Sequence, residues 1–225
     1  MQGKVFTKEQ RAIHKLIVDS IGLNDIGLFD GKMGIIISLI TYSRCNKLKC
    51  IEDMADFLME QVLENITNVM PLSFSDGITG FGWGIEYLIQ NGYMPGCGAD
   101  ICVEIDKKLM SYDIRRIDNY SLEHGIYGWL HYIVAHIQGA NICGRAVFDR
   151  MYIMDLLTKL QKYSSNNKTA DEFKTLQNML IEVLNGATNV YKFPLEEIIK
   201  SDIKFSINNL SLHKGLAGYL MTKKC

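Results

Sequence analysis

A short glycine motif recurs along the chain and constrains the fold more than any other feature of the sequence. Each copy has a small residue, then Leu or Phe, two variable residues, Gly-x-x-Gly and an apolar run. The copies occupy residues 27–34, 73–80, 121–128 and 211–218. Their first glycines, Gly31, Gly77, Gly125 and Gly215, are separated by 46, 48 and 90 residues, so the last interval spans two periods. Such a period is typical of helix–turn–helix repeats, and the copy expected near residue 170 has either lost its glycines or is absent.

The segments between the motifs alternate between two kinds of helix. The segments after the first three motifs, residues 35–42, 81–89 and 129–137, are apolar on most faces, as in buried helices. The intervening segments are amphipathic with one charged face: residues 7–21, 50–67, 99–112, 145–163 and 169–186. Proline, which long helices tolerate poorly, occurs only three times. The alternation predicts an all-α fold in which outer helices cover a layer of inner helices.

The paired glycines imply close packing at the start of each inner helix. Residues at i and i+3 share a helix face, and glycine in a helix costs about 1 kcal/mol relative to alanine. A cost repeated at one repeat position indicates that a neighbouring backbone approaches there. We therefore expect Gly31, Gly77, Gly125 and Gly215 to lie in the first turns of buried helices.

These motifs resemble those of the lanthionine synthetase C-like (LanC-like) family. The stretches 75–84 and 210–218 are the most similar, and the resemblance extends over nearly the whole chain. It implies one domain, residues 1–225, with Gly-x-x-Gly motifs at the starts of its inner helices. Because the chain holds only about four to five helical hairpins of this period, the resemblance implies an incomplete α/α toroid.

The family resemblance also bears on zinc chemistry. The family's cyclases use zinc to activate a peptide cysteine for addition to a dehydrated Ser or Thr, since zinc lowers a thiol pKa. The family's zinc ligands lie in Trp-Cys-x-Gly and Cys-His-Gly turns, and the chain has neither; its last motif reads Leu212-His213-Lys214-Gly215. We therefore expect no zinc and no other cofactor. The sequence His124-Gly125 matches a family His-Gly proposed as an acid or base.

Candidate site residues occupy the variable positions of the turns, which a ring would gather at one mouth. Glu123 and His124 are the candidate catalytic pair, and Asp30, Asp76 and His213 are candidate ligand-binding residues. The alternative for Asp30 and Asp76 is helix capping, because carboxylates suit helix N-termini. The alternative for His213 is an ordinary surface histidine.

The histidines and aromatic residues within the inner segments have a simpler interpretation. His131 and His136 are five residues apart, so they do not share a helix face, and we expect both to be satisfied core residues. The aromatic residues of these segments are expected in the core, with an aromatic-lined cavity as the alternative. They are Phe81, Trp83, Tyr87, Tyr127, Trp129 and Tyr132.

Two functions of different classes fit these observations. The first is a zinc-less LanC-like accessory protein that binds a peptide or protein partner in modified-peptide maturation. The second is an enzyme, either a diverged cyclase or an α/α-toroid glycoside hydrolase with paired carboxylates drawn from Asp30, Asp76 and Glu123. Carboxylates bonded to their own helix ends would favour capping.

Bulk composition limits the partners and the compartment. The formal net charge is −1, so no basic excess predicts a nucleic-acid partner, and no apolar run reaches the roughly 18 residues of a membrane span. The six cysteines form no Cys-x-x-Cys pair, and residues 1–20 lack a signal-peptide pattern. We expect reduced thiols and a cytoplasmic protein, and the sequence leaves the oligomeric state open.

Overall fold

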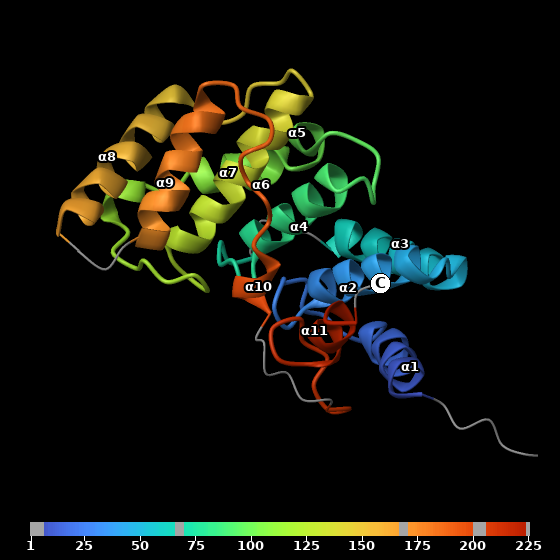
Figure 1. Ribbon diagram of the computed structural model, residues 1–225. Helices are drawn as coiled ribbons and strands as arrows, with labels where there is room; N and C mark the ends of the chain where they lie inside the picture. The colour runs from blue at the N-terminus through green and yellow to red at the C-terminus, as the bar shows by residue number, and fades with distance from the viewer. Residues whose placement is uncertain (1–6, 66–69, 167–170, 200–205, 224–225) are drawn as a thin grey trace, which may run out of the picture. The chain divides into compact units, whose positions relative to one another are not determined.

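The computed structural model describes residues 7–65, 70–166, 171–199 and 206–223 (Figure 1). Within these ranges the chain is all-helical, with no β-strand, which confirms the predicted all-α class. The chain divides into two compact units. Unit 1 comprises residues 1–67 and 194–225, and unit 2 comprises residues 68–193.

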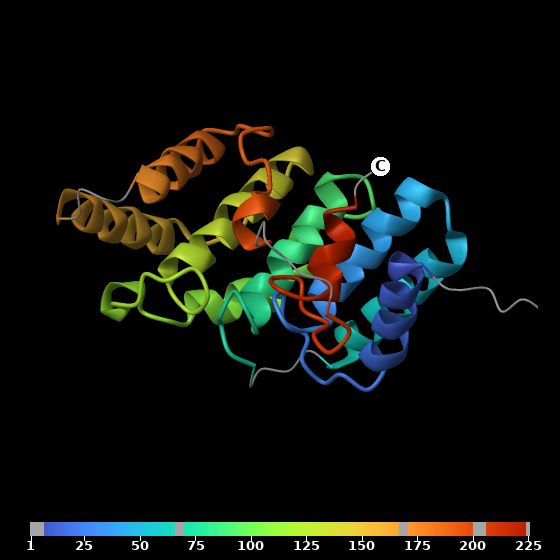
Figure 2. The same cartoon turned by 60° about the horizontal axis from the view of Figure 1, so that its bottom comes forward.

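Unit 1 is built around one long and one short buried helix. Its helices are α1 (Lys8–Ser20), α2 (Lys32–Asn46), α3 (Lys49–Asn65), α10 (Leu195–Ile198) and α11 (Leu216–Met221). Helix α2 is buried along most of its length and packs against α3 and α11 (Figure 2). Helix α1 starts with a capping box between Thr7 and Gln10 and buries the stripe Ala12, Ile13 and Leu16, so the apolar side of an amphipathic helix covers the unit.

Unit 2 contains the longer run of repeats. Its helices are α4 (Ile78–Gln90), α5 (Gly98–Ile101), α6 (Val103–Met110), the 3-10 helix η1 (Ile114–Arg116), α7 (Ile126–Ile142), α8 (Arg150–Asn166) and α9 (Asp171–Leu184). Helices α4 and α7 are buried over most of their lengths and pack against each other. The predicted inner segments therefore do form the buried helices of both units.

Helix α9 packs alongside α7. Tyr127 and Phe173, near the starts of α7 and α9, have ring centroids 4.7 Å apart. Near the ends of these helices, Asn141 Nδ2 donates to the Val183 carbonyl at 2.7 Å. Helix α9 therefore runs parallel to α7 (Figure 1), and it begins at Asp171, near the position expected for the degenerate or absent copy. The predicted amphipathic helix over 169–186 is confirmed for residues 171–184, since the buried residues Phe173, Leu176, Leu180 and Val183 form one face. Its place in an outer layer stays a prediction.

The other outer helices follow the predicted segments with small changes. The expected helix over 99–112 is divided at Cys102 into α5 and α6, and the helix expected from residue 145 begins at Arg150. Two ends of predicted segments, residues 66–67 and 169–170, lie outside the described residues.

All four glycine turns share one local geometry. In each, the first glycine is the helix N-cap, and the next residue's N–H donates to the carbonyl of a residue seven positions earlier. These bonds are Lys32–Asp25 (2.8 Å), Ile78–Pro71 (3.0 Å), Ile126–Asn119 (2.9 Å) and Leu216–Asn209 (2.8 Å). A Cβ on any of the four glycines would lie 2.2–2.5 Å from a backbone atom of its own turn. The first glycine is thus required by the turn itself, and it lies immediately before the helix rather than inside it.

The second glycine of the motif meets a neighbouring motif. A Cβ on Gly34 would lie 2.7 Å from Leu212 Cβ, and a Cβ on Gly128 would lie 2.5 Å from Phe74 Cβ. Backbone bonds join the same pairs of turns: Leu212 N–H donates to the Phe29 carbonyl at 2.7 Å, and Phe74 N–H to the Glu123 carbonyl at 2.8 Å. A Cβ on Gly34 or Gly128 would lie closer still to the carbonyl oxygen of Leu28 or Leu122 in its own turn, at 2.2 or 2.1 Å. The predicted close approach of a neighbouring repeat is therefore one of two reasons for the second glycine.

Two further expectations concern the cysteines and membrane-spanning helices. Cys45 is disulfide-bonded, contrary to the expectation of reduced thiols, whereas Cys50, Cys97, Cys102 and Cys143 are free. None of the helices in the described ranges is long and apolar enough to span a bilayer.

Candidate functional site

Two glycine turns of unit 2 are held side by side by backbone hydrogen bonds. The Glu123 carbonyl, in the turn before α7, accepts from the N–H groups of Phe74 and Ser75 at 2.8 and 3.1 Å. Phe74 is completely buried, whereas Glu123 is exposed. Glu123 therefore fixes the geometry through its main chain while its side chain faces solvent.

Polar side chains gather where these two turns meet, and we call Ser73, Ser75, Asp76, Glu123 and His124 the polar turn cluster. Asp76 Oδ1 accepts hydrogen bonds from the hydroxyls of Ser73 and Ser75, the latter at 2.9 Å. His124 Nδ1 lies 3.5 Å from Asp76 Oδ1 and 3.4 Å from Ser75 Oγ. The side chains of His124 and Asp76 remain 55% and 48% exposed, so they are positioned yet accessible.

The surroundings of Asp76 favour its ionised form. Desolvation opposes ionisation, but hydrogen bonds from Ser73 and Ser75 and the charge of His124 outweigh it and lower the pKa of the Asp76 carboxyl. A carboxyl held ionised in this way accepts hydrogen bonds and attracts cations, and it is a poor proton donor at neutral pH.

The cluster lacks the arrangement of an activated nucleophile. In a Ser-His-Asp relay the hydroxyl and the carboxylate contact opposite ring nitrogens. Here Ser75 and Asp76 both approach Nδ1 of His124. The cluster can therefore orient a ligand by hydrogen bonds and charge, but its Ser75 hydroxyl is not placed for proton abstraction through His124.

The helix-capping interpretation of Asp30 and Asp76 is wrong. The N-caps of α2 and α4 are Gly31 and Gly77, and neither helix has a side-chain cap hydrogen bond. Their first N–H groups already donate to loop carbonyls of Asp25 and Pro71. The helix starts are consequently satisfied by their own turns, which leaves those first N–H groups unavailable to an anionic ligand.

The two other candidate residues lie in unit 1. Asp30 is exposed in the turn before α2. The His213 ring stacks on Phe29, with centroids 4.9 Å apart and planes at 4°, and its Nδ1 contacts the Ile198 carbonyl. His213 is thus a packed, half-buried side chain rather than an ordinary surface histidine, and the convergence of all four turns on one mouth stays a prediction.

A buried ionic network in unit 2 was missed by the sequence analysis. His136 lies between two carboxylates, with Nδ1 2.7 Å from Glu86 Oε1 and Nε2 2.9 Å from Asp106 Oδ2. Tyr132 donates to Asp106 at 2.6 Å, and Gln90 donates to Glu86 at 2.6 Å. Glu86 and His136 are 0% exposed and Asp106 is 6% exposed.

The charge state of His136 follows from its neighbours. Desolvation lowers its pKa, but hydrogen bonds and charges of Asp106 and Glu86 outweigh desolvation and raise the pKa to about 9. His136 is therefore an imidazolium at neutral pH, paired on both nitrogens. This confirms the expected satisfied core histidine, and the network is structural.

His131 occupies the aromatic core of unit 2. Tyr191 OH accepts from Trp83 Nε1 at 2.7 Å and lies 2.7 Å from His131 Nδ1. Burial lowers the pKa of His131 to about 3, so the ring is neutral. Its buried Nε2 has no hydrogen-bond partner among the described residues, so the expectation of a satisfied core histidine holds for Nδ1 alone. Trp83 stacks on Tyr87 and meets Phe193 edge-on, which fits the expected core packing.

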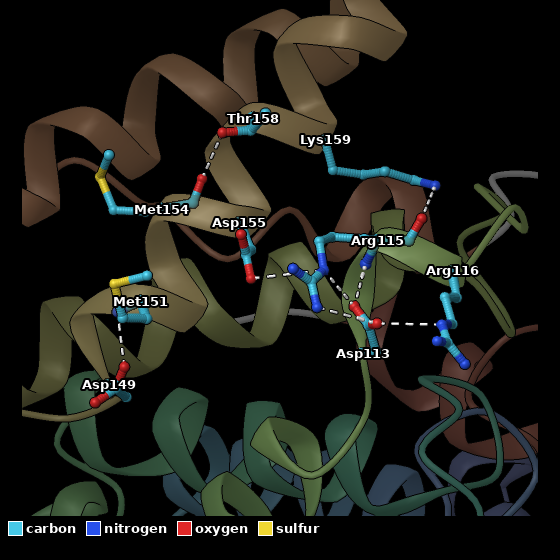
Figure 3. A network of polar contacts seen from close by, with 9 residues as sticks. All are labelled: Asp113, Arg115, Arg116, Asp149, Met151, Met154, Asp155, Thr158 and Lys159. Atoms are coloured by element: carbon cyan, nitrogen blue, oxygen red, sulfur yellow. Dashed lines mark hydrogen bonds and ion pairs between the residues drawn. The ribbon is translucent and has the colours of Figure 1, made fainter.

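A surface hollow beside η1 and α8 is a second candidate site. It measures about 360 Å³ and is lined by Arg115, Asp118, Tyr120, Asp155, Thr158, Lys159, Lys162 and Tyr163. Figure 3 shows Arg115 between Asp113, at 2.8 Å, and Asp155, at 3.8 Å. Lys159 pairs with Asp118 at 3.0 Å. Because these cations are already paired with carboxylates, the hollow favours a ligand less than the polar turn cluster does.

Metal ligation and similarity to other proteins do not extend the description of this site. Within the described ranges, no three His, Cys, Asp or Glu side chains are grouped so that they could hold a metal ion. Comparison with protein-family models, curated proteins and solved structures finds no match.

Proposed function

We propose that this chain is a LanC-like, incomplete α/α toroid that binds a peptide at the polar turn cluster without cyclising it. The repeat contacts support the ring. The second motif contacts the third through Phe74 and Glu123, and the fourth contacts the first in the same way through Leu212 and Phe29. Repeat proteins pack each repeat against its neighbour through a recurring contact, so the two equivalent motif contacts support a repeat architecture of this kind.

One observation carries the assignment of the binding site: the exposed contact between His124 and Asp76. It joins two turns that backbone bonds hold rigidly, and neither side chain is used in capping its helix. Preorganised, accessible polar groups recognise a ligand without the entropic cost of ordering them first. The corresponding place in unit 1 is filled by the stacked rings of Phe29 and His213, which makes unit 2 the preferred binding side.

The charges of the cluster indicate the ligand's chemistry. Asp76 is held ionised and Glu123 presents a second carboxylate to solvent, so the surface suits a peptide with basic or hydrogen-bond-donating groups. By the family resemblance, the peptide would be a precursor in modified-peptide maturation, or a segment of a partner protein.

The enzymatic alternative has less support. A glycoside hydrolase needs one carboxyl with a raised pKa to protonate the leaving group. The pKa of Asp76 is lowered instead, so Asp76 does not suit the acid role. A hydrolase would then depend on Asp30 or Glu123 for proton donation.

The proposal predicts that a Glu123→Ala, His124→Ala double variant loses peptide binding. Peptides would be selected from a displayed random library on the full chain, and their affinities measured by fluorescence anisotropy. We expect selected peptides to be enriched in Lys and Arg, and the double variant to weaken binding at least about tenfold, the effect of about 1.4 kcal/mol. Retained far-ultraviolet circular dichroism would show that the variant is folded.

The matched control is the Asp30→Ala, Lys214→Ala double variant, which removes exposed turn residues from unit 1. It should bind the selected peptides like the original chain. Unchanged binding by the folded Glu123, His124 variant would contradict the proposed site and make the outer helices the next candidate surface.

A further inference from the structure

Two free thiols meet at the edge of unit 2. Cys97 is the N-cap of α5, and Cys143 is the C-cap of α7. The Cys143 thiol is hydrogen-bonded to the Cys97 side chain. Cys143 is exposed and Cys97 is half-buried, so the pair can be reached from solvent.

A buried carboxylate holds the two backbone segments together. A Cβ on Gly98, next to Cys97, would lie 1.8 Å from Glu86 Oε1. A Cβ on Gly139, one helical turn before Cys143, would lie 2.1 Å from Glu86 Oε2. Both glycines therefore pack against one carboxylate, and that carboxylate is fixed by His136 and Gln90.

A surface ion pair joins the same two segments on the solvent side. Asp100, three residues after Cys97, lies 3.4 Å from Arg145, two residues after Cys143. Such an exposed pair contributes little stability, but it shows that the chain on both sides of the thiols is in contact. Two contacts besides the hydrogen bond between the thiols therefore bring Cys97 close to Cys143.

We propose that Cys97 and Cys143 form a dithiol site that a low-molecular-weight disulfide, such as oxidised glutathione, converts to an intramolecular disulfide. One cysteine thiolate attacks a sulfur of the small disulfide, which forms a mixed disulfide and releases one small thiolate. The second cysteine then loses its proton and attacks the protein sulfur of the mixed disulfide, releasing the second small thiolate. Two protein thiols are oxidised, and one small disulfide is reduced to two thiols.

The surroundings of Cys143 limit the reactivity of its thiol. Although the residue is exposed, partial desolvation of the thiol, the hydrogen bond to Cys97 and the nearby charges raise the pKa of Cys143 to about 11, so its thiolate is scarce at neutral pH. Once formed, the disulfide would tie the start of α5 covalently to the end of α7, across the carboxylate of Glu86.

The test incubates the full chain with glutathione at defined ratios of oxidised to reduced form, then blocks remaining thiols with a maleimide. Peptide mapping without reduction should identify a Cys97–Cys143 disulfide that is lost again as reduced glutathione increases. Cys97→Ser and Cys143→Ser should each abolish it and leave a glutathione adduct on the remaining cysteine. Cys50→Ser, which removes an exposed free thiol of unit 1, should leave it unchanged.

Two results would overturn the proposal. One is stable glutathione adducts on both Cys97 and Cys143 of the unsubstituted chain, because neighbouring thiols would displace glutathione. The other is failure of both thiols to react under a fully oxidised glutathione pool while Cys50 does react.

Discussion

Gly128→Ala should lower the free energy of unfolding by about 1–3 kcal/mol or more, the usual effect of overpacking a rigid core. A Cβ at this position would lie 2.1 Å from the Leu122 carbonyl oxygen and 2.5 Å from Phe74 Cβ. Both obstacles are backbone or backbone-proximal atoms, so no side-chain rotation relieves the overlap. Urea unfolding followed by circular dichroism would measure the change.

The control for this substitution is Gly22→Ala. No atom of the described residues lies within 4 Å of a Cβ added at Gly22, and its φ is outside the left-handed region. We therefore expect Gly22→Ala to change stability by less than about 0.5 kcal/mol, as surface substitutions usually do. Equal stabilities of the two variants would show that the second glycine of the motif is not a packing requirement.

The repeat could be predicted from sequence because its signal is periodic and local. Glycine is required by close contacts that depend on the turn, and the turn recurs wherever an inner helix begins. The turn nevertheless extends further than the predicted motif. Asp25, Asn119 and Asn209 each accept a hydrogen bond through their side chains from the residue two positions later. The Asx residues of these turns stand two residues before the first, third and fourth motifs, whereas the second motif has Pro71 at that position.

The repeat predicted that the turns carrying Asp76 and His124 lie at the same end of their helices, but it did not predict that these two side chains pair. The detailed geometry of their contact could not be predicted, because it depends on which ring nitrogen of His124 faces the turn of Asp76. Helix α9 shows a further limit: without glycines, Phe173 and Leu176 have the spacing of any amphipathic helix.

The buried ionic network could not be predicted from the sequence, because its members are distant along the chain. Glu86 and His136 are fifty residues apart, and each lies in a largely apolar helix. The available signal was Glu86 itself, since a carboxylate on an otherwise apolar inner helix is buried only when paired. Identifying its partners requires the register of α4 against α7, which hydrophobic periodicity does not specify.

His136→Gln should lower the free energy of unfolding by about 3–5 kcal/mol at neutral pH, the range for breaking a buried ion pair. Glutamine can still donate one hydrogen bond, but it leaves Glu86 and Asp106 buried without a cation between them. The matched control is His14→Gln, because His14 is exposed on α1. Denaturant unfolding should show this loss of unfolding free energy in His136→Gln and no loss in His14→Gln.

The pH dependence separates this ionic role from simple packing. The pKa of His136 is raised to about 9 in the folded chain, against about 6.5 when unfolded. Its protonated form therefore contributes fully below about pH 6.5, and the contribution of about 3 kcal/mol declines as pH rises through 9. The difference in unfolding free energy between the original chain and His136→Gln should shrink between pH 7 and 10, while the His14→Gln difference stays constant. A His136 difference that does not change with pH would mean that the ring is neutral in the folded protein and acts only as a packed hydrogen-bonding group.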